Sequence, residues 1–327
     1  MRSLQAALVG AVTLLSLPTV SAELFPWAAI GDSFSAGPGA GDKFLGGGGS
    51  CMRRVGSYPA QLRRDFPHAN QHAQFLSCTG DKVPGLLDQI PHMSKNQKVV
   101  TISIGGNDSG FGRILKACVF KPGGPFSDNC DEVIAKMLNE RIKEDKLVDQ
   151  LHKAYAAVSN RISGRQPRRL VLVQLYPNFF NQETDWCDGQ NMGLFHSDET
   201  LLTRDLRRKL NDLGNMVRDR ITTAVESYKN PEEETWIALD RNNELYEGHR
   251  FCEPGHETLD NEDIWFFKMF GNDSRLQTRE VAGILDEYDP KTCKDDPDYE
   301  EDFVFGWYCD QARYTDYLRN ESMSHHA

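Results

Sequence analysis

Short apolar runs that alternate with helical patterns constrain the fold of this chain more than any other feature. Five runs have the length and composition of buried β-strands, at 27–30, 75–76, 99–104, 170–175 and 236–240. The segments between them carry apolar residues at helical spacing, at 58–66, 83–90, 132–163 and 206–221. Strands that alternate with helices over this length indicate a mainly parallel sheet with helices on both faces. We therefore predict an α/β fold, arranged as a three-layer α/β/α sandwich.

The first 22 residues have the pattern of a secretory signal peptide. Met1-Arg2 precede an apolar run over 6–17, and Val20-Ser21-Ala22 ends in small residues of the kind found at cleavage sites. Pro18 interrupts this run, and no later stretch approaches the ~18 apolar residues of a membrane span. We expect a secreted, extracellular protein without stable membrane insertion, with a single domain over 23–327.

Net charge and cysteine content narrow the class of protein further. A formal net charge of −11 argues against nucleic acid and anionic membrane surfaces as partners. Eight cysteines in a secreted chain predict disulfides rather than a zinc or redox site, and no C-x-x-C motif occurs. The spacing of the cysteines alone does not determine how they pair. We expect no metal, no organic cofactor and a monomer.

The C-terminal part of the sequence is less regular. The strand and helix pattern fades from about residue 257, and 286–302 is rich in acidic residues without the spacing of an EF-hand. We interpret this segment as a solvated acidic extension of the domain rather than a calcium site. Asn272 and Asn320 lie in glycosylation sequons on expected surface loops. Asn107 also lies in a sequon, but its expected role, given below, requires it to stay unmodified.

The stretch Ile30-Gly31-Asp32-Ser33 places a serine directly after the first predicted strand. The glycines around it favour a turn that lifts the Ser33 hydroxyl off the end of the sheet. Residue 35 is Ser rather than Gly, so this is not the G-x-S-x-G elbow of the α/β-hydrolases. Taken alone, Ser33 fits a turn or N-cap serine as well as it fits a nucleophile.

Two later stretches favour the nucleophile. Gly80 lies in a tight loop within Ser77-Cys78-Thr79-Gly80-Asp81, and Asn107 follows the third predicted strand within Gly105-Gly106-Asn107-Asp108. A serine that attacks an ester needs hydrogen-bond donors for the developing oxyanion. The backbone N–H groups of Ser33 and Gly80 and the side-chain amide of Asn107 are suited to that task. In parallel sheets ligands bind beyond the carboxyl ends of the strands, where all three fall.

In this order, Gly31-Asp32-Ser33, Gly80 and Gly105-Gly106-Asn107-Asp108 resemble the first three motif blocks of the SGNH (GDSL) hydrolase family. The resemblance covers most of 26–255 and is to the family's secreted lipase/esterase branch of actinobacteria and fungi. It implies a flavodoxin-like topology and a serine ester hydrolase that forms an acyl-enzyme on Ser33. Its substrates would be small-molecule, lipid or polysaccharide acyl esters. It also implies the disulfides Cys51–Cys78, Cys118–Cys130 and Cys187–Cys252, which leaves Cys293 and Cys309 as a fourth pair.

The general base is where this chain departs from the family. The family's histidine motif is Asp-x-x-His or His-Pro near the C-terminus, and no His-Pro dipeptide occurs here. His249, in Gly248-His249-Arg250-Phe251-Cys252, resembles the family's Gly-His-x-x-Cys element, which precedes the catalytic histidine. It follows the last strand, and a backbone carbonyl could orient its imidazole because residue 246 is Tyr rather than an acid.

His249 is therefore our candidate for the general base, and two alternatives to it stay open. His325 and His326 lie about where the family's histidine segment would begin, and a chain without any competent base would be a catalytically impaired binding protein or a truncated form. His68 and His72 have the spacing of a zinc pair but lack the glutamate of His-Glu-x-x-His. Phe111, Phe120 and Phe126 are candidates for an acyl-binding groove or for the core.

Overall fold

In the computed structural model, the described residues form one α/β domain. They are 26–45, 51–66, 72–120, 128–142, 146–163, 168–192, 201–259, 263–266 and 288–296, with 299, 306, 308–310, 312–313 and 315–317 near the C-terminus. The predicted signal peptide, the sequons at Asn272 and Asn320, and His325 and His326 lie outside them.

Five parallel strands form the sheet, as the sequence predicts. In sequence they are β1 (Trp27–Gly31), β2 (Gln74–Phe75), β3 (Val99–Ser103), β4 (Arg169–Gln174) and β5 (Glu234–Leu239). Their spatial order is β2-β1-β3-β4-β5, and every neighbouring pair is parallel. This is the flavodoxin-like order, in which the direction of winding reverses between β1 and β3 and the ligand site lies at that switch point.

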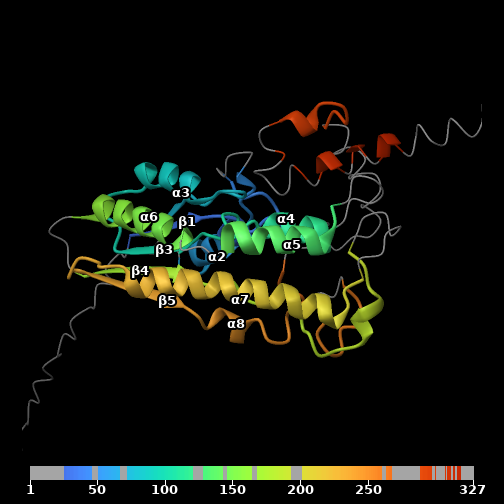
Figure 1. Cartoon of the computed structure of the whole chain (residues 1–327). Coiled ribbons are helices and arrows are strands. Elements are labelled where there is room, and N and C mark those ends of the chain that lie inside the picture. The colour runs from blue at the N-terminus through green and yellow to red at the C-terminus, as the bar shows by residue number, and fades with distance from the viewer. Residues whose placement is uncertain are drawn as a thin grey trace, which may run out of the picture.

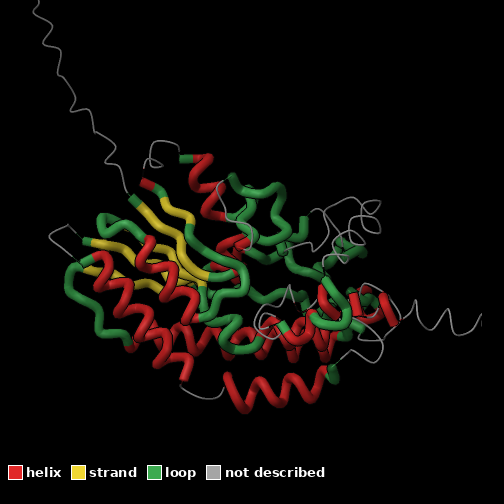
Figure 2. Tube along the Cα trace, turned by 90° about the horizontal axis from the view of Figure 1, so that it is seen from above, coloured by secondary structure: helices red, strands yellow, loops and turns green. Residues whose placement is uncertain are grey.

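Helices lie on both sides of the sheet (Figures 1 and 2). The long helices of one side are α3 (Val83–Gln89), α6 (Lys146–Ile162) and α7 (Arg204–Ser227), and α4 (Phe111–Cys118) and α5 (Cys130–Met137) extend that layer. On the other side, α2 (Tyr58–Asp65) covers β1 and β2. Two further helices have four residues each, α1 (Ser33–Ala36) after β1 and α8 (Asn242–Leu245) after β5.

Apolar side chains that alternate along the strands build two cores. The larger one contains Ala28, Ile30, Val100, Ile102, Val171 and Val173, all fully buried, against the helices of the α3, α6 and α7 layer. The smaller one joins Trp27, Ala29 and Phe75 to Ala60 of α2. Because side chains of a strand point to opposite faces in turn, this pattern places one residue set on each face. The three-layer sandwich is therefore confirmed.

The helical pattern over 132–163 is not one helix. Helix α5 passes at Leu138–Ile142 into a π-helical turn, and α6 begins at Lys146. The sequence patterns do not predict helix α4.

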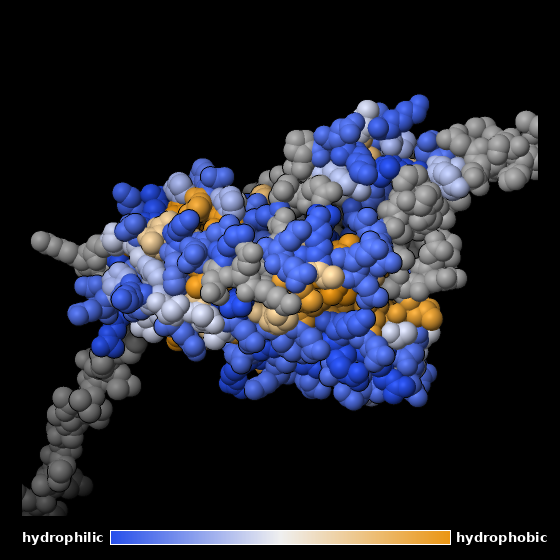
Figure 3. Space-filling model, in the orientation of Figure 1, coloured by the Kyte–Doolittle hydropathy of each residue, from blue (hydrophilic) through white to orange (hydrophobic). Residues whose placement is uncertain are grey.

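The outer face of α7 is polar. Figure 3 shows it as a blue band below an apolar strip, where α7 meets the neighbouring layer. None of the helices in the described part of the chain is long and apolar enough to cross a membrane.

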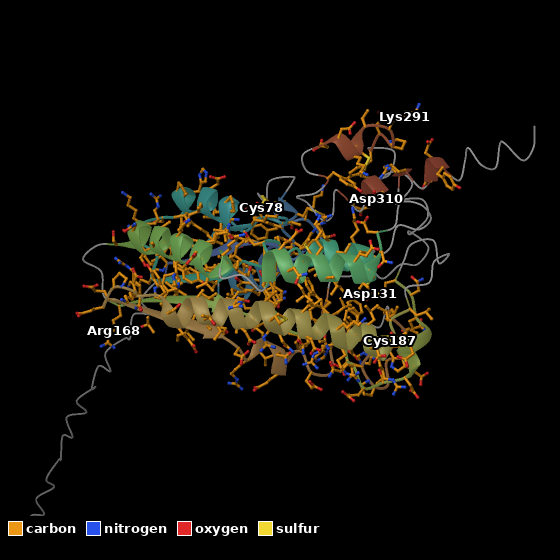
Figure 4. All side chains as sticks on the ribbon, viewed as in Figure 1. Cys78, Asp131, Arg168, Cys187, Lys291 and Asp310 are labelled. Atoms are coloured by element: carbon orange, nitrogen blue, oxygen red, sulfur yellow. A yellow bond between two sulfur atoms is a disulfide. The ribbon has the colours of Figure 1, made fainter. Side chains whose placement is uncertain are left out.

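The C-terminal segment is tied to α4 by a buried ion pair. Lys116 of α4 lies 2.7 Å from Oδ2 of Asp310, whose side chain is fully buried. The Tyr299 hydroxyl and the Arg313 guanidinium both donate to Oδ1 of Asp310, at 2.9 and 3.1 Å. Figure 4 shows Asp310 in the segment above α4. The acidic extension is therefore anchored on the domain through one of its own acids.

The structure contains four disulfides, at the pairs that the family resemblance implies. They are Cys51–Cys78, Cys118–Cys130, Cys187–Cys252 and Cys293–Cys309. The first and third close loops at the carboxyl edge of the sheet. In Figure 4 Cys187 lies at that end of the molecule and Arg168, which precedes β4, at the opposite end.

Candidate active site

Ser33 is the first residue of α1, the short helix that follows β1. Asp32 is its N-cap, and Oδ1 of Asp32 accepts the Phe34 N–H at 3.1 Å. Gly37 ends the helix in the left-handed conformation, with φ of 75°, which glycine adopts without steric cost. Ser33 is partly exposed. Within the described ranges, no residue forms a hydrogen bond with the Ser33 hydroxyl or accepts one from its N–H.

Gly31 lets this turn lie directly against β3. Its φ is +136°, and a Cβ atom there would lie 2.1 Å from the carbonyl oxygen of Ser103. This close approach allows a backbone hydrogen bond, in which the Asp32 N–H donates to the Ser103 carbonyl oxygen at 2.8 Å. A side chain at residue 31 would separate the Ser33 turn from the loop that carries Asn107.

The Gly80 loop is joined to the Ser33 turn on the other side. The Cys78 N–H donates to the Gly31 carbonyl at 2.8 Å, and the disulfide Cys51–Cys78 links the loop to the segment that begins at Cys51. Arg53 supports the same loop by donating to the Ser77 carbonyl at 2.8 Å. Gly80 has φ of +86°. Its N–H donates to no acceptor among the described residues.

Asn107 and Asp108 connect the third loop to the second. One N–H of the Asn107 amide donates to the Asp81 carbonyl at 3.0 Å, and Oδ1 of Asp108 accepts the Val83 N–H at 3.0 Å. The other N–H of the Asn107 amide has no acceptor in the described part of the chain. The Asn107 side chain is engaged in the fold here, which is consistent with the prediction that this sequon stays unmodified.

Gln89 adds a buried link between the first two loops. From the end of α3, its amide donates to the Gly31 carbonyl at 2.8 Å and to Oδ2 of Asp81 at 2.5 Å, and it accepts the Gly31 N–H at 2.8 Å. All three loops are thus held at one edge of the sheet, around the switch point between β1 and β3.

The Asp32 carboxylate is buried beneath Ser33. It accepts hydrogen bonds from the Phe34 N–H, from the Ser103 hydroxyl at 3.1 Å and from the Tyr176 hydroxyl. Burial raises the pKa of Asp32 to about 7, and the charge of Asp108 acts in the same direction, against the effect of the three donors. The folded protein therefore retains a proton on Asp32 at pH values where an exposed aspartate has lost it.

This proton predicts that Asp32→Asn changes how stability depends on pH. Between about pH 4 and 7 the folded state binds the Asp32 proton more tightly than the unfolded state, so rising pH lowers the free energy of unfolding across this window and not above it. The difference between 3.8 and about 7 corresponds to roughly 4 kcal/mol. Urea denaturation at pH 4.5 and 8 should show that the free energy of unfolding of the wild type falls, relative to that of Asp32→Asn, by up to that amount as the pH rises. Parallel pH profiles for the two proteins would contradict the assignment.

His249 lies in the loop after β5, at the same edge of the sheet. Its Nδ1 lies 2.7 Å from the Asp263 carbonyl oxygen, and its ring stacks on Trp265 with 3.7 Å between centroids. A carbonyl oxygen only accepts, so Nδ1 carries a proton, and in the neutral form of the ring Nε2 then keeps its lone pair. A backbone carbonyl thus orients the imidazole, in the way that the sequence analysis considers for this residue.

The path from His249 to Ser33 consists of aromatic rings. Trp265 contacts Tyr246 at 5.7 Å between centroids, and Tyr246 contacts Phe34, the neighbour of Ser33, at 6.5 Å. In the part of the chain that the structure describes, no hydrogen bond joins His249 to Ser33. The structure links His249 to the nucleophile turn through three successive ring contacts, and it does not bring the His249 and Ser33 side chains into contact.

Several contacts fix the His249 loop. The backbone runs beside Phe179–Asn181, with the Phe251 N–H donating to the Phe179 carbonyl at 3.0 Å. The buried carboxylate of Glu253 accepts the Gly248 N–H at 3.2 Å and the Asn181 amide at 2.9 Å. Cys187–Cys252 closes the same loop.

Comparison with known proteins identifies the arrangement. A model of the GDSL-like lipase/acylhydrolase family matches residues 29–220, which contain the Ser33, Gly80 and Asn107 loops. The chain belongs to this family. A lipase of Streptomyces rimosus is 32% identical over 175 residues, or 53% of this chain and 60% of the relative. Lipase 1 of Streptomyces coelicolor is 31% identical over 185 residues, or 56% of this chain and 63% of the relative. The alignments therefore span less than two thirds of either lipase.

Two solved structures share the fold. The extracellular lipase of Streptomyces rimosus superimposes with a TM-score of 0.55 and 24% identity, over 80% of this chain and 98% of that one. Phospholipase A1 from Streptomyces albidoflavus NA297 gives a TM-score of 0.53 and 24% identity, over 69% and 83% of the two chains.

Among the other histidines of this GDSL-family chain, His196, His325 and His326 lie outside the described residues. His152 contacts the Ala224 carbonyl and the Ser227 hydroxyl at the C-terminal end of α7. His68 lies outside the described ranges, so the zinc-pair hypothesis for His68 and His72 is not addressed. Across the described residues, no group of three or more His, Cys, Asp or Glu side chains is placed to hold a metal ion.

The phenylalanines considered for an acyl groove divide into two kinds. Phe120 is buried in the main core. Phe111 is partly exposed and stacks on Phe179, with 5.1 Å between centroids. Phe179 in turn contacts Phe266, and Phe266 contacts Tyr246. Phe126 lies outside the described residues.

The sequence patterns do not indicate Gln89 or Tyr176 as parts of the site, and they include Asp32 only as a member of the Gly31-Asp32-Ser33 motif, without a role of its own. Tyr176 had a signal, since it stands two residues beyond β4 at the edge where the motif loops lie. Gln89 occupies a buried position of α3, and a polar residue on the buried side of a helix calls for a hydrogen-bond partner.

Proposed function

We propose that this protein is a secreted serine ester hydrolase of the lipase/esterase type that cleaves carboxylic acyl esters. One observation carries the proposal. Ser33 is partly exposed at the switch point of the sheet, and its hydroxyl has no hydrogen-bond partner among the described residues. Beside it, the backbone N–H groups of Ser33 and Gly80 and one N–H of the Asn107 amide have no acceptor among the described residues. The lipase relatives support acyl esters as the substrate class.

In the proposed reaction, the Ser33 hydroxyl attacks the ester carbonyl and His249 Nε2 takes its proton. The two side chains are not in contact in this structure, so this step requires the imidazole to approach Ser33. The Ser33 N–H, the Gly80 N–H and the Asn107 amide donate to the oxyanion of the tetrahedral intermediate, and each such donor is typically worth about 10²–10³ in kcat. The intermediate expels the alcohol, which receives the proton from His249. Water, deprotonated by the same imidazole, then attacks the acyl-enzyme and releases the acid with Ser33 restored.

Secretion follows from the signal-peptide pattern of residues 1–22 and is supported by the four disulfides, which persist in oxidising compartments. The substrate would bind as a monomeric or aggregated ester against the aromatic side chains beside Ser33. Phe34, Tyr246, Phe179 and Phe111 are partly exposed there and are joined by ring contacts, with the buried Phe266 between Tyr246 and Phe179.

The test is hydrolysis of a 4-nitrophenyl ester series from acetate to palmitate by the secreted wild-type protein. We expect kcat/KM to rise with acyl length beyond acetate, because longer chains bury more apolar surface against these rings. Ser33→Ala in parallel separates enzymatic turnover from background. If the folded wild type hydrolyses no ester of the series in a Ser33-dependent manner, the hydrolase proposal fails and the binding-protein alternative gains.

A further inference from the structure

Tyr176 connects two of the three motif loops through a single hydroxyl. It stands two residues after β4, outside every motif block. Its hydroxyl donates to Oδ2 of Asp32 and accepts the Gly106 N–H at 3.2 Å. Its ring also packs edge-on against Phe34, with 5.6 Å between centroids.

Both hydrogen-bond partners directly precede proposed oxyanion donors. Asp32 precedes Ser33, whose N–H is one donor, and Gly106 precedes Asn107, whose amide is another. A Cβ atom at residue 106 would lie 3.2 Å from Cζ and 3.3 Å from the hydroxyl oxygen of Tyr176. The glycine therefore keeps the space that lets the hydroxyl reach the backbone of this loop.

The direction of the two hydrogen bonds is fixed by chemistry. A backbone N–H only donates, so the Tyr176 oxygen accepts from Gly106, and when Asp32 is ionised its carboxylate can only accept the proton of the Tyr176 hydroxyl. Burial, followed by the charge of Asp32, raises the pKa of Tyr176 well above its usual range. The phenol thus keeps its proton at any pH at which the enzyme would work.

We infer that Tyr176 is a positioning residue, which holds the Ser33 N–H and the Asn107 amide at the spacing that the oxyanion requires. This inference rests on the proposed function. Tyr176 touches neither substrate nor reacting atoms in this account. It acts on the rate through Asp32 and Gly106, by joining the end of β1 to the loop after β3.

We expect removal of the Tyr176 hydroxyl to lower kcat less than removal of an oxyanion donor would, but much more than removal of an ordinary buried hydroxyl would. A misplacement of about 1 Å in a catalytic site can cost about 10²-fold, and loss of one donor about 10²–10³. Tyr176→Phe keeps the ring and removes the hydroxyl. We expect kcat at pH 8 to fall about 10- to 100-fold, with KM within about threefold of wild type.

Tyr58→Phe is the matched control. The Tyr58 hydroxyl likewise lies between two partners, Ser35 Oγ at 3.0 Å and Thr101 Oγ1 at 2.8 Å, but it contacts neither Asp32 nor Gly106 through a hydrogen bond. Both variants lose a hydroxyl with two hydrogen bonds, so both should lose stability. Only Tyr176→Phe should lose kcat by tenfold or more, measured well below the melting temperature of each protein.

A second readout does not depend on turnover. In a Ser33→Ala background, ¹³C NMR of the aspartate carboxyls follows the titration of Asp32. The other groups that face this carboxylate are the Ser103 hydroxyl, the Phe34 N–H and the charged Asp108, which Tyr176→Phe leaves in place. Removing the Tyr176 donor should move the pKa of Asp32 above its wild-type value of about 7.

Three results are decisive. A selective kcat loss in Tyr176→Phe together with a higher pKa of Asp32 supports the inference. Equal kcat values in Tyr176→Phe and Tyr58→Phe, with an active wild type, would overturn it while leaving the hydrolase proposal intact. Absence of Ser33-dependent turnover in the wild type would instead overturn the proposed function. In that case, an unchanged pKa of Asp32 in Tyr176→Phe would also show that Tyr176 makes no hydrogen bond to Asp32.

Discussion

Ser33→Ala is expected to abolish ester hydrolysis without unfolding the protein. In serine hydrolases, loss of the nucleophile lowers kcat by roughly 10⁶-fold. The structure gives a reason to expect an unchanged fold, because Asp32 caps α1 through the Phe34 N–H and the Ser33 hydroxyl bonds no described residue. We therefore expect a free energy of unfolding within about 0.5 kcal/mol of wild type. The measurement is kcat/KM on the best ester of the series, with urea denaturation of both proteins.

Ser35→Ala is the control for this experiment. Ser35 lies in the same four-residue helix, is fully buried, and bonds the hydroxyls of Tyr58 and Ser77 at 3.0 and 2.8 Å. Its replacement should cost about 1–3 kcal/mol of stability and leave kcat close to wild type. Retained hydrolysis in Ser33→Ala, or an equal loss in Ser35→Ala, would show that the activity does not depend on the Ser33 hydroxyl.

His249→Ala is expected to lower kcat by roughly 10⁴-fold or more, since the nucleophile and its base act as a unit. The contacts of His249 set this expectation. Its Nδ1 is bonded to the Asp263 carbonyl, which leaves Nε2 as the ring nitrogen that would accept the Ser33 proton once the imidazole approaches Ser33. Imidazole added to the His249→Ala protein should restore part of the rate, because it replaces the base without replacing the loop.

His256→Ala is the matched control, because it removes a partly exposed imidazole from the same loop, beyond Cys252. It should leave kcat unchanged. Full activity in His249→Ala would exclude His249 as the base, and activity lost on replacement of His325 or His326 would place the base in the C-terminal tail. This pair of outcomes separates the alternatives that the sequence leaves open.

The layout of the sheet could be predicted from the sequence because strands buried on both faces leave continuous apolar runs. Trp27–Ile30, Val99–Ile104 and Leu170–Leu175 each match a strand to within one residue at either end. Helix α4 could not be predicted in the same way. It begins directly after the Asn107 loop, and its N-cap Gly110, at φ of 75°, provides no side-chain cap to signal a helix start.

The candidate site is likewise only partly predictable from the sequence. Ser33, Gly80 and Asn107 could be selected because local motifs carry them. The residues that hold their loops together, Gln89 and Tyr176, act over separations of 58 and 144 residues in sequence, and only the topology brings them to their partners. A backbone carbonyl as the partner of His249 could be expected because residue 246 is Tyr rather than an acid, but no residue type indicates that the carbonyl is that of Asp263.

The central claim is that Ser33 is an activated nucleophile, and covalent labelling tests it most directly. The secreted wild-type protein is treated with a fluorophosphonate, which reacts with activated serine hydroxyls, and the labelled peptide is located by mass spectrometry. We predict one adduct per chain, on Ser33, absent from Ser33→Ala and formed much more slowly in His249→Ala. A folded wild-type protein that takes up no label, or that carries it on a different residue, would contradict the account.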